Sequence, residues 1–435
     1  MPANPSPLQT LRDELASSST TPSEIAARFA AKANGSSSHN TYLPPFTSES
    51  LERAEQLPRI FADKGNRPAL YGIPISIKDC FDVAGGVTTC GSRFYAQHNP
   101  PAKKNSWIAQ RLLDAGAILT GKTHLHQLAY GVTGENADYG DCLQPRDKTL
   151  FTGGSSSGAA ASVQEGSALV AIGTDTGGSV RIPSALCGLA GYRSSHGIAH
   201  GESRWAGGYH LAPTFDTIGL LFRDLRDAAI LADAIFDIAP VPAPAAVRIG
   251  CVSDDFLSDC EPEVLDAYAA WKQHLAEHGA SFSTFDTSFW KESPQIYSPI
   301  VASEAAVIHR GHFQHFEPVI AERLAYGASI PSAELQSLRQ RLQAFRVKMF
   351  SLFENYDLLL APCAPVSKLH ARQDHTESRR AILRYTTPAS LAGLPAVTLP
   401  GEHIGAAFGT GMQLLAAPMH DATLLAFASA LACRY

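Results

Sequence analysis

Short apolar segments that alternate with helical segments constrain the fold of this chain more than any other feature of its sequence. Isoleucine occupies every second position from Ile73 to Ile77, which predicts a strand over residues 71–78. Further apolar strands are predicted at residues 117–120, 168–172, 247–251, 356–360 and 396–399. Helical patterns at residues 107–115 and 159–163 separate the first three of these strands. Such alternation predicts an α/β fold whose sheet is covered by helices on both faces.

Further helical signals come from the start and the middle of the chain. Leu8, Leu11 and Leu15 share one face of a helix, and residues 21–24 form a capping box with proline at the first helical position. A proline-rich joint at residues 239–244 is followed by a helix-rich portion at about 261–355. Strand patterns return after it, and the sequence contains no internal repeat, so we expect one large domain over residues 1–435.

Composition limits the classes of function. The 435 residues are 45% hydrophobic and 17% charged, which allows a sizeable buried core. The formal net charge of −6 gives no electrostatic reason to expect a nucleic-acid partner or an anionic membrane. No apolar run reaches the ~18 residues of a membrane span, and residues 1–10 lack the features of a signal peptide. We expect a cytoplasmic protein, monomeric or homodimeric.

Cysteine and histidine lack the spacing of a disulfide scaffold or a metal site. The eight cysteines are scattered and include no C-x-x-C pair, which favours reduced, buried thiols. His124 and His126 are two positions apart, and the other histidines include no H-E-x-x-H pattern. The sequence predicts neither a metal site nor a cofactor.

Two motifs match known patterns by their letters alone. Residues 116–123 match the phosphate-binding pattern G-x-x-x-x-G-K-[ST], which needs a loop between a strand and a helix. Here the four variable residues are Ala-Ile-Leu-Thr, which are typical of a strand, and a helix comes before them. Residues 288–291 match the S-x-x-K pattern of penicillin-binding enzymes, but its Ser-Asp-Asn and Lys-Thr-Gly companions are missing. We expect neither motif to have the function that its letters imply.

A third motif offers an alternative nucleophile. Residues 154–158 contain G-x-S-x-G, the nucleophile elbow of α/β-hydrolases, with Ser156 in the nucleophile position. The elbow requires an apolar strand directly before it, whereas residues 145–152 are charged and only weakly strand-like. An esterase that uses Ser156 stays an alternative hypothesis.

Two turns rich in glycine and serine carry the strongest chemical signal. Ser155 lies in the first turn, before an alanine-rich helix, and Ser179 lies in the second turn, after the strand at 168–172. The two serines are 24 positions apart, about the length of one helix, one strand and two turns, so we expect both turns at one end of the sheet. Gly177 and Gly178 admit backbone conformations that aim successive amides into one concavity, where an oxyanion is stabilised. The hydroxyl of Ser179 would lie beside those donors.

Lys78 is the candidate base. A serine at its ordinary pKa is a weak nucleophile that needs a base, and no histidine lies near either turn in sequence. Lys78 ends an apolar strand, where burial would favour the neutral form of its amine. Asp79 could oppose this effect, but successive residues of a strand point to opposite faces. The alternative interpretation is a lysine at the edge of the sheet whose amine reaches solvent.

These motifs resemble the amidase signature family, whose pattern runs from Gly-Gly-Ser-Ser through Asp-Thr-Gly-Gly-Ser to Arg-x-Pro. The corresponding residues here are 153–156, 175–179 and 181–183. The resemblance covers most of the chain and includes segments at 71–74, 78–79, 113–123, 134–136, 215–219, 357–362, 391–395 and 411–414. It implies a mixed β-sheet sandwiched between helices.

The resemblance also assigns roles to residues. It implies that Ser179 is the nucleophile, that Ser155 lies on a cis peptide and bridges to the base, and that this base is Lys78. The backbone amides that would form the oxyanion hole belong to Thr176, Gly177, Gly178 and Ser179. The side chains that would brace the turns belong to Ser156, Asp175 and Arg181.

In its motifs the chain looks most like the plant-type branch of the family, which hydrolyses indole-3-acetamide. Two departures from the commoner family pattern contribute to this likeness: Ser157 replaces glycine, and Leu220 replaces proline. Residues 128–133, which line the acyl pocket in the family, include no charged side chain here. We expect the substrate to be a small neutral amide with an apolar or aryl acyl group. The residues expected to contact it are Tyr130, Gly131, Val132, Trp205 and Tyr209.

Two alternatives within the family stay open. A glutaminase-type subunit of a tRNA amidotransferase would act on glutamine and would need a partner subunit. A non-catalytic amidase-like binding protein would lose catalytic residues and carry an anchor or helical repeats, whereas this sequence keeps Lys78, Ser155 and Ser179 and shows neither addition.

Overall fold

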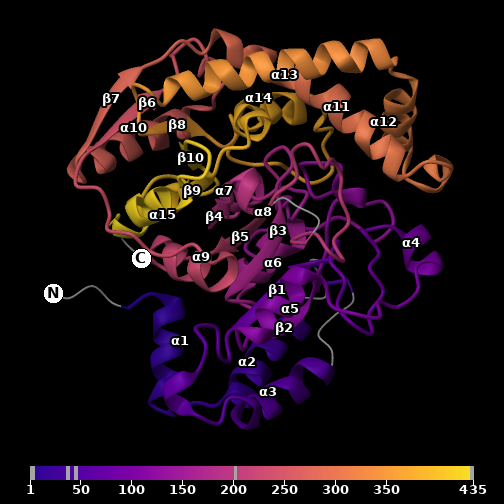
Figure 1. The fold of residues 1–435 in the computed structure, drawn as a ribbon, viewed down its shortest axis with the longest axis vertical. Coiled ribbons are helices and arrows are strands. Elements are labelled where there is room, and N and C mark those ends of the chain that lie inside the picture. Colours follow the sequence, from indigo (N-terminus) through magenta and orange to yellow (C-terminus); the bar gives the residue numbers. More distant parts are fainter. Residues whose placement is uncertain (1–4, 36–39, 44–47, 200–202, 432–435) are drawn as a thin grey trace.

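A ten-stranded mixed sheet organises the computed structural model, which describes residues 5–35, 40–43, 48–199 and 203–431. In chain order the strands are β1 (Pro74–Lys78), β2 (Ile118–Thr123), β3 (Val170–Thr174), β4 (Ala190–Arg193), β5 (Ile218–Phe222), β6 (Val247–Cys251), β7 (Ala280–Thr284), β8 (Leu358–Pro362), β9 (Ala396–Pro400) and β10 (Gly411–Ala416). Their order across the sheet is β2-β1-β3-β5-β4-β9-β10-β8-β6-β7. Helices surround this sheet (Figure 1), which confirms the predicted α/β fold with a mixed, sandwiched sheet.

The N-terminal helices follow their sequence signals. Helix α1 (Pro7–Ala16) buries the three leucines predicted to share a face. Helix α2 (Pro22–Gly35) begins with the predicted capping box, because the amide of Thr21 donates to the Glu24 carboxylate (2.9 Å) and the amide of Glu24 donates to Thr21 Oγ1 (3.2 Å). Helix α3 (Ser48–Ile60) completes this region and packs on α2 and β2.

The first three strands position the candidate site. The chain leaves β1 through α5 (Trp107–Asp114) to β2, and then returns through α6 (Ser157–Glu165) to β3 on the other side of β1. All three strands are parallel, and right-handed crossovers in opposite directions place α5 and α6 on opposite faces of the sheet. The direction in which successive strands are added to the sheet therefore reverses at β1. This switch point lies at the carboxyl ends of β1 and β3, and α/β proteins commonly bind ligands at such a point.

The region of residues 116–123 is a strand rather than a phosphate-binding loop. Gly116 follows α5 with φ +84°, and residues 118–123 form β2, so Lys122 lies within the sheet. Lys122 Nζ pairs with the buried carboxylate of Asp79 at 2.5 Å. The interpretation that this motif matches only by its letters is confirmed.

The helix-rich portion contains four long helices and one strand. Its helices are α10 (Pro262–Glu277), α11 (Ser293–Ile308), α12 (Pro318–Ser329) and α13 (Ser332–Leu352), and β7 lies between the first two. Helices α11 and α13 pack against α14 (Thr376–Ala392), and Figure 1 shows α11 to α14 gathered at one end of the fold. The remaining helices of the described chain are α4 (Arg93–His98), α7 (Arg181–Leu186), α8 (His196–Ala199), α9 (Ala228–Phe236) and α15 (Asp421–Ala430).

The cysteines agree with the expectation of reduced, buried thiols where the structure describes them. Seven described cysteines are free, and all of them except the half-buried Cys260 are buried; Cys433 lies outside the described residues. Within the described ranges, none of the helices combines the length and the apolar composition that crossing a bilayer requires.

Helix α6 packs so closely on the neighbouring backbone that its first turn needs glycine. A Cβ atom at Gly158 would overlap the carbonyl oxygen of Thr41 and the amide nitrogen of His124. We therefore predict that Gly158→Ala lowers the free energy of unfolding by about 1–3 kcal/mol, although alanine is the better helix former by ~1 kcal/mol. Chemical denaturation measures this change. The control Gly86→Ala, where the nearest atom to a new Cβ is at 3.4 Å, should change it by less than ~0.5 kcal/mol, and a stabilised Gly158→Ala variant would contradict the packing described.

Candidate active site

The amine of Lys78 lies between two hydroxyl groups at the carboxyl ends of β1 and β3. Lys78 Nζ donates to Ser155 Oγ and to Thr174 Oγ1, each at 2.7 Å. Ile77 of β1 is in register with Ile172 of β3, so the parallel pairing brings the ends of the two strands side by side. The first glycine-serine turn then places Ser155 against the same amine. The predicted convergence of Lys78 and the first turn at one end of the sheet is what the structure shows.

Lys78 is fully buried and forms no ion pair with an acidic side chain among the described residues. Asp79, its neighbour in sequence, pairs with Lys122 instead, in keeping with the expectation that it points away from Lys78. Burial lowers the pKa of Lys78 to about 8, and weaker interactions with Cys80 and Asp216 only partly oppose this. A substantial fraction of the amine is therefore neutral in mildly alkaline solution.

The two serines after Gly154 have different surroundings. The peptide bond between Gly154 and Ser155 is cis, as the family resemblance implies. Ser156 Oγ donates to the carbonyl of Thr174 (3.2 Å) and accepts from the amide of Thr174 (3.3 Å), while the amide of Ser156 donates to the carbonyl of Ser179 (3.3 Å). Ser156 therefore fastens the first turn to the end of β3, and its hydroxyl faces backbone rather than a basic side chain.

Asp175 holds the second turn through a buried cluster of charges. Its carboxylate accepts from Arg181 Nε (3.0 Å) and Nη2 (2.9 Å), and from Arg193 Nη1 (2.8 Å). Burial alone would raise the pKa of Asp175, but the two guanidinium groups hold this pKa well below its usual range. All three side chains have no exposed surface. Arg181 was predicted to brace the turn, whereas Arg193 of β4 was missed; an arginine within a short apolar segment was the available signal.

The amides of the second turn divide into two groups. The amide of Gly178 donates to Asp175 Oδ1 at 2.8 Å, so it is already engaged. Within the described residues, the amides of Thr176, Gly177 and Ser179 have no hydrogen-bond partner. Ser179 is 4% exposed, and its hydroxyl makes no hydrogen bond to Ser155 in the described part of the chain. Three amide donors thus remain beside the hydroxyl of Ser179.

Side chains from α11, α14 and the loop before β5 close over the second turn, and none of them was predicted as a site residue. Thr386 Oγ1 of α14 donates to the carbonyl of Gly177. A Cβ atom at Gly177 would overlap the hydroxyl of Tyr297 from α11, so this phenol lies directly over the turn. Asp216 accepts from Thr176 Oγ1 at 2.6 Å and ties the turn to the loop before β5. Each of these residues lies at least 37 positions from Ser179, which is why local patterns did not reveal them.

The predicted acyl-pocket segment lies against the first turn. The amide of Gly154 donates to the carbonyl of Val132 at 2.7 Å, and the amide of His126 donates to the carbonyl of Ser155 at 3.2 Å. Tyr130 is buried, and a Cβ atom at Gly131 would overlap the ring of His126. The structure therefore brings Tyr130, Gly131 and Val132 to the site, next to the cis peptide.

Trp205 and Tyr209 lie on the loop before β5, with different exposure. Trp205 is 5% exposed; its ring stacks on His210 at a centroid distance of 4.1 Å and packs on Phe81 at 5.6 Å. Tyr209 is 38% exposed, and its amide donates to the carbonyl of Cys80 at 2.8 Å. The loop is therefore attached to the segment that follows Lys78, with Trp205 packed inside it and Tyr209 facing solvent.

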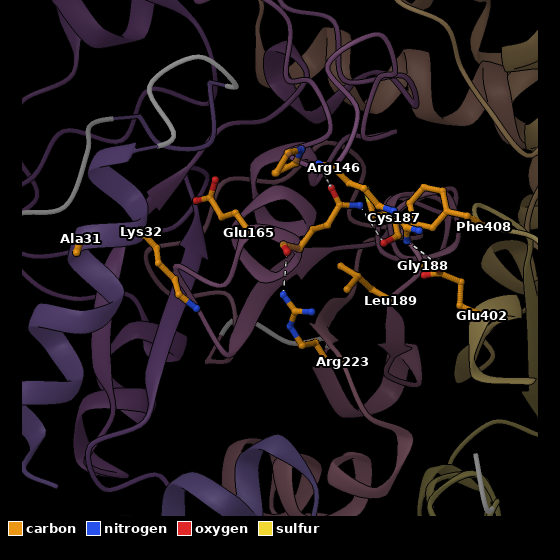
Figure 2. Close-up of a pocket in the computed structure, with 12 residues that line it drawn as sticks. Ala31, Lys32, Arg146, Glu165, Cys187, Gly188, Leu189, Arg223, Glu402 and Phe408 are labelled. Atoms are coloured by element: carbon orange, nitrogen blue, oxygen red, sulfur yellow. Dashed lines mark hydrogen bonds and ion pairs between the residues drawn. The ribbon is translucent and has the colours of Figure 1, made fainter. Parts of the chain in front are cut away.

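A cavity of about 540 Å³ lies at the other end of α6 and is separate from this site (Figure 2). Arg223 reaches into it and donates to the carbonyls of Val163 (2.6 Å) and Gln164 (2.8 Å) at the C-terminus of α6. Arg146 in the same cavity pairs with Glu402 at 2.5 Å. These two cations are accounted for by helix capping and ion pairing, since basic side chains stabilise the carbonyl end of a helix.

Comparison with known proteins gives the family. The amidase family profile matches residues 24–425. The chain belongs to the amidase family. A glutamyl-tRNA(Gln) amidotransferase subunit of Chlorobium phaeobacteroides is 28% identical over 97% of each chain. The 1-carboxybiuret hydrolase subunit of Pseudomonas sp., called AtzE, is 31% identical over 82% of this chain and 83% of that relative.

A solved structure described as an amidase agrees with this assignment. It superimposes with a TM-score of 0.88 at 28% identity and covers 97% of this chain and 98% of its own. The protein is an amidase-family enzyme that hydrolyses carbon–nitrogen bonds. Both named relatives are bacterial, so they support the family and not its plant-type branch.

The buried charge cluster around Asp175 predicts a large loss of stability when its acid is removed. Asp175→Asn leaves Arg181 and Arg193 without their compensating charge, which costs about 3–5 kcal/mol of unfolding free energy. Asp357→Asn is the matched control, because Asp357 pairs with the half-exposed Arg248 at 2.9 Å and should cost less than ~1 kcal/mol. Urea denaturation of both variants checks this, and equal losses would contradict the assigned role of Asp175.

Proposed function

We propose that the enzyme hydrolyses a small amide through an acyl-enzyme on Ser179, with Ser155 and Lys78 as the proton relay. The observation that carries this proposal is the position of Lys78 Nζ, 2.7 Å from Ser155 Oγ in a buried site where no acid pairs with the amine among the described residues. A neutral amine can accept a proton, whereas an ammonium group cannot. The low pKa of Lys78 that burial produces therefore supports its role as the base.

The relay moves two protons and forms one bond. Lys78 accepts the proton of Ser155 as Ser155 accepts the proton of Ser179, and Ser179 Oγ attacks the carbonyl carbon of the amide. Rotation of the Ser179 side chain brings its hydroxyl to Ser155. The carbon–nitrogen bond then breaks, and the relay returns a proton to the leaving nitrogen. Water attacks the acyl-enzyme through the same relay and releases the acid.

The oxyanion of the tetrahedral intermediate would be held by the amides of Thr176, Gly177 and Ser179. Gly178 was also expected to donate, but its amide is engaged by Asp175 in this structure, so we assign it to bracing the turn. Ser156, Asp175 and Arg181 support the two turns through the hydrogen bonds described above. Such fixed donors typically contribute ~3–4 kcal/mol each to stabilisation of the transition state.

The alternatives differ in how much the contacts favour them. Ser156 as an esterase nucleophile is disfavoured, because its hydroxyl is hydrogen-bonded to the backbone of Thr174 and no base lies against it in the described chain.

The glutaminase hypothesis is supported by the likeness to the glutamyl-tRNA(Gln) amidotransferase subunit over 97% of both chains. Co-purification of a second, different chain would favour it over a monomer or homodimer. The indole-3-acetamide preference stays a prediction from motifs alone.

The nucleophile assignment predicts a ranking of serine variants. Ser179→Ala should lower kcat by at least about 10⁴-fold, because the acyl-enzyme cannot form. Ser156→Ala should retain turnover within about 100-fold of wild type, because it loses only a brace of the turn. Ammonia release from a primary amide measures both, with circular dichroism as a check of folding. The opposite ranking would support the nucleophile elbow at Ser156.

The lysine base predicts the direction of the pH dependence. The pKa of Lys78 is lowered to about 8, so the neutral form is lost as the pH falls below that value. We expect kcat/KM for an uncharged amide to rise with pH and to level off above an apparent pKa of about 8. Lys78→Arg should be inactive at every pH, since a guanidinium stays protonated. A profile that stays flat down to pH 5 would exclude a lysine base.

A further inference from the structure

Two arginines face the candidate active site without an acidic partner. Arg323 lies on α12 and Arg379 on α14, so both come from helices far in sequence from the acyl-pocket segment at residues 128–133. In the described part of the chain, neither forms an ion pair with an aspartate or a glutamate. Glu317 and Glu135 are close enough to raise the pKa of Arg323 but do not pair with it: Glu317 lies 3.6 Å from His126, and Glu135 accepts from Thr133 at 2.6 Å.

Arg323 is anchored on Tyr130 of the acyl-pocket segment. Its Nη1 donates to the carbonyl of Tyr130 at 2.6 Å, and its guanidinium carbon lies 5.4 Å from the centre of the Tyr130 ring. Burial and the neighbouring charge of Arg379 lower the pKa of Arg323 to about 10. The two guanidinium groups are therefore close enough to repel each other.

Arg379 is the more unusual of the two, because its Nε is buried and has no hydrogen-bond partner in the described structure. It lies seven residues before Thr386 on α14, which is two helical turns and about 10 Å along the same face. Thr386 bonds the carbonyl of Gly177 in the second turn. The face of α14 that carries Arg379 is thus the face that covers the site.

Tyr297 connects this charged region to the reacting centre. Its hydroxyl lies over Gly177, two residues before Ser179, and burial raises the pKa of this phenol, an effect that the nearby guanidinium of Arg379 partly opposes. A substrate whose carbonyl lies beside Ser179 would therefore extend its acyl group past Tyr297 toward the two arginines.

A buried Nε without a hydrogen-bond partner is costly, and two guanidinium groups close together repel each other. An anionic group of the substrate would remove this cost, because arginine binds carboxylates through parallel, charge-assisted hydrogen bonds. Residues 128–133 contain no charged side chain, which led to the expectation of a neutral acyl group. The charges come instead from α12 and α14.

We propose that Arg379 and Arg323 bind a carboxylate on the acyl group of the substrate, which makes the preferred substrate a monoamide of a small dicarboxylic acid. This inference rests on the proposed amidase mechanism at Ser179 and names the substrate class of that site. The carboxyl group in the name of the related 1-carboxybiuret hydrolase is consistent with it.

Matched amides test this proposal on the wild-type enzyme. Glutaramate and pentanamide have the same chain length and differ in whether the chain ends in a carboxylate or a methyl group. We expect kcat/KM, measured by ammonia release, to be at least about 10-fold higher for glutaramate. Glutamine is glutaramate with an added α-ammonium group, which the two arginines repel, so it should be hydrolysed at least about 10-fold more slowly than glutaramate.

Neighbouring arginines on α14 provide a matched pair of variants. Arg379→Gln should lower kcat/KM for glutaramate by about 10- to 100-fold and leave that for pentanamide within about 3-fold. Arg380→Gln is the control, because Arg380 is exposed and pairs with Glu377, and it should change neither value by more than about 2-fold. If Arg379→Gln fails to fold, the comparison of amides on the wild-type enzyme still decides.

The outcomes separate this inference from the proposed function. Pentanamide hydrolysed as fast as glutaramate, or glutamine hydrolysed faster, would overturn the carboxylate site while leaving the mechanism intact. An equal effect of Arg379→Gln on both amides would also overturn it. Absence of turnover for every amide, together with no covalent labelling of Ser179 by a reactive phosphonate, would overturn the mechanism itself.

Discussion

Lys78 holds its amine 2.7 Å from the hydroxyls of both Ser155 and Thr174, and the rest of the site is arranged around these two contacts. The three residues come from β1, the first glycine-serine turn and β3, which only the parallel pairing of the strands brings together. The contacts can work as a relay only while the amine is neutral. Its neutrality depends on burial between the central strands, and the adjoining Asp79 pairs with Lys122 instead, so these strands control the chemistry as well as the shape of the site.

The second turn is positioned from a greater distance. Asp175 is held by Arg181 and Arg193 and in turn accepts from the amide of Gly178, so a buried ionic cluster fixes the backbone beside Ser179. Buried pairs of this kind add little net stability compared with apolar packing, but they fix geometry where each hydrogen bond has a defined direction. Helices α11 and α14 then close over the turn through Tyr297 and Thr386. These two helices therefore belong to the site as well as to the covering of the sheet.

The sequence predicted what depends on local pattern. The strand at 247–251 has the predicted bounds, the capping box at residues 21–24 forms, and Lys78 meets Ser155 as expected from the two turns. What it missed depends on contacts between distant segments. Strand β4 is four residues long, and its Arg193 is tolerable only because Asp175 lies opposite. Arg379 and Arg380 are indistinguishable in sequence, since only the packing of α14 decides that one has a buried Nε near the site and that the other is exposed.

Ser179 carries the covalent intermediate in the proposed mechanism, and peptide mapping after treatment with a reactive phosphonate tests this most directly. A single phosphonyl group on the peptide that contains Ser179 is the predicted result, formed more slowly in a Lys78→Ala variant because the relay has lost its base. A phosphonyl group on Ser156, or labelling of Ser179 at the same rate without Lys78, would contradict the proposed relay.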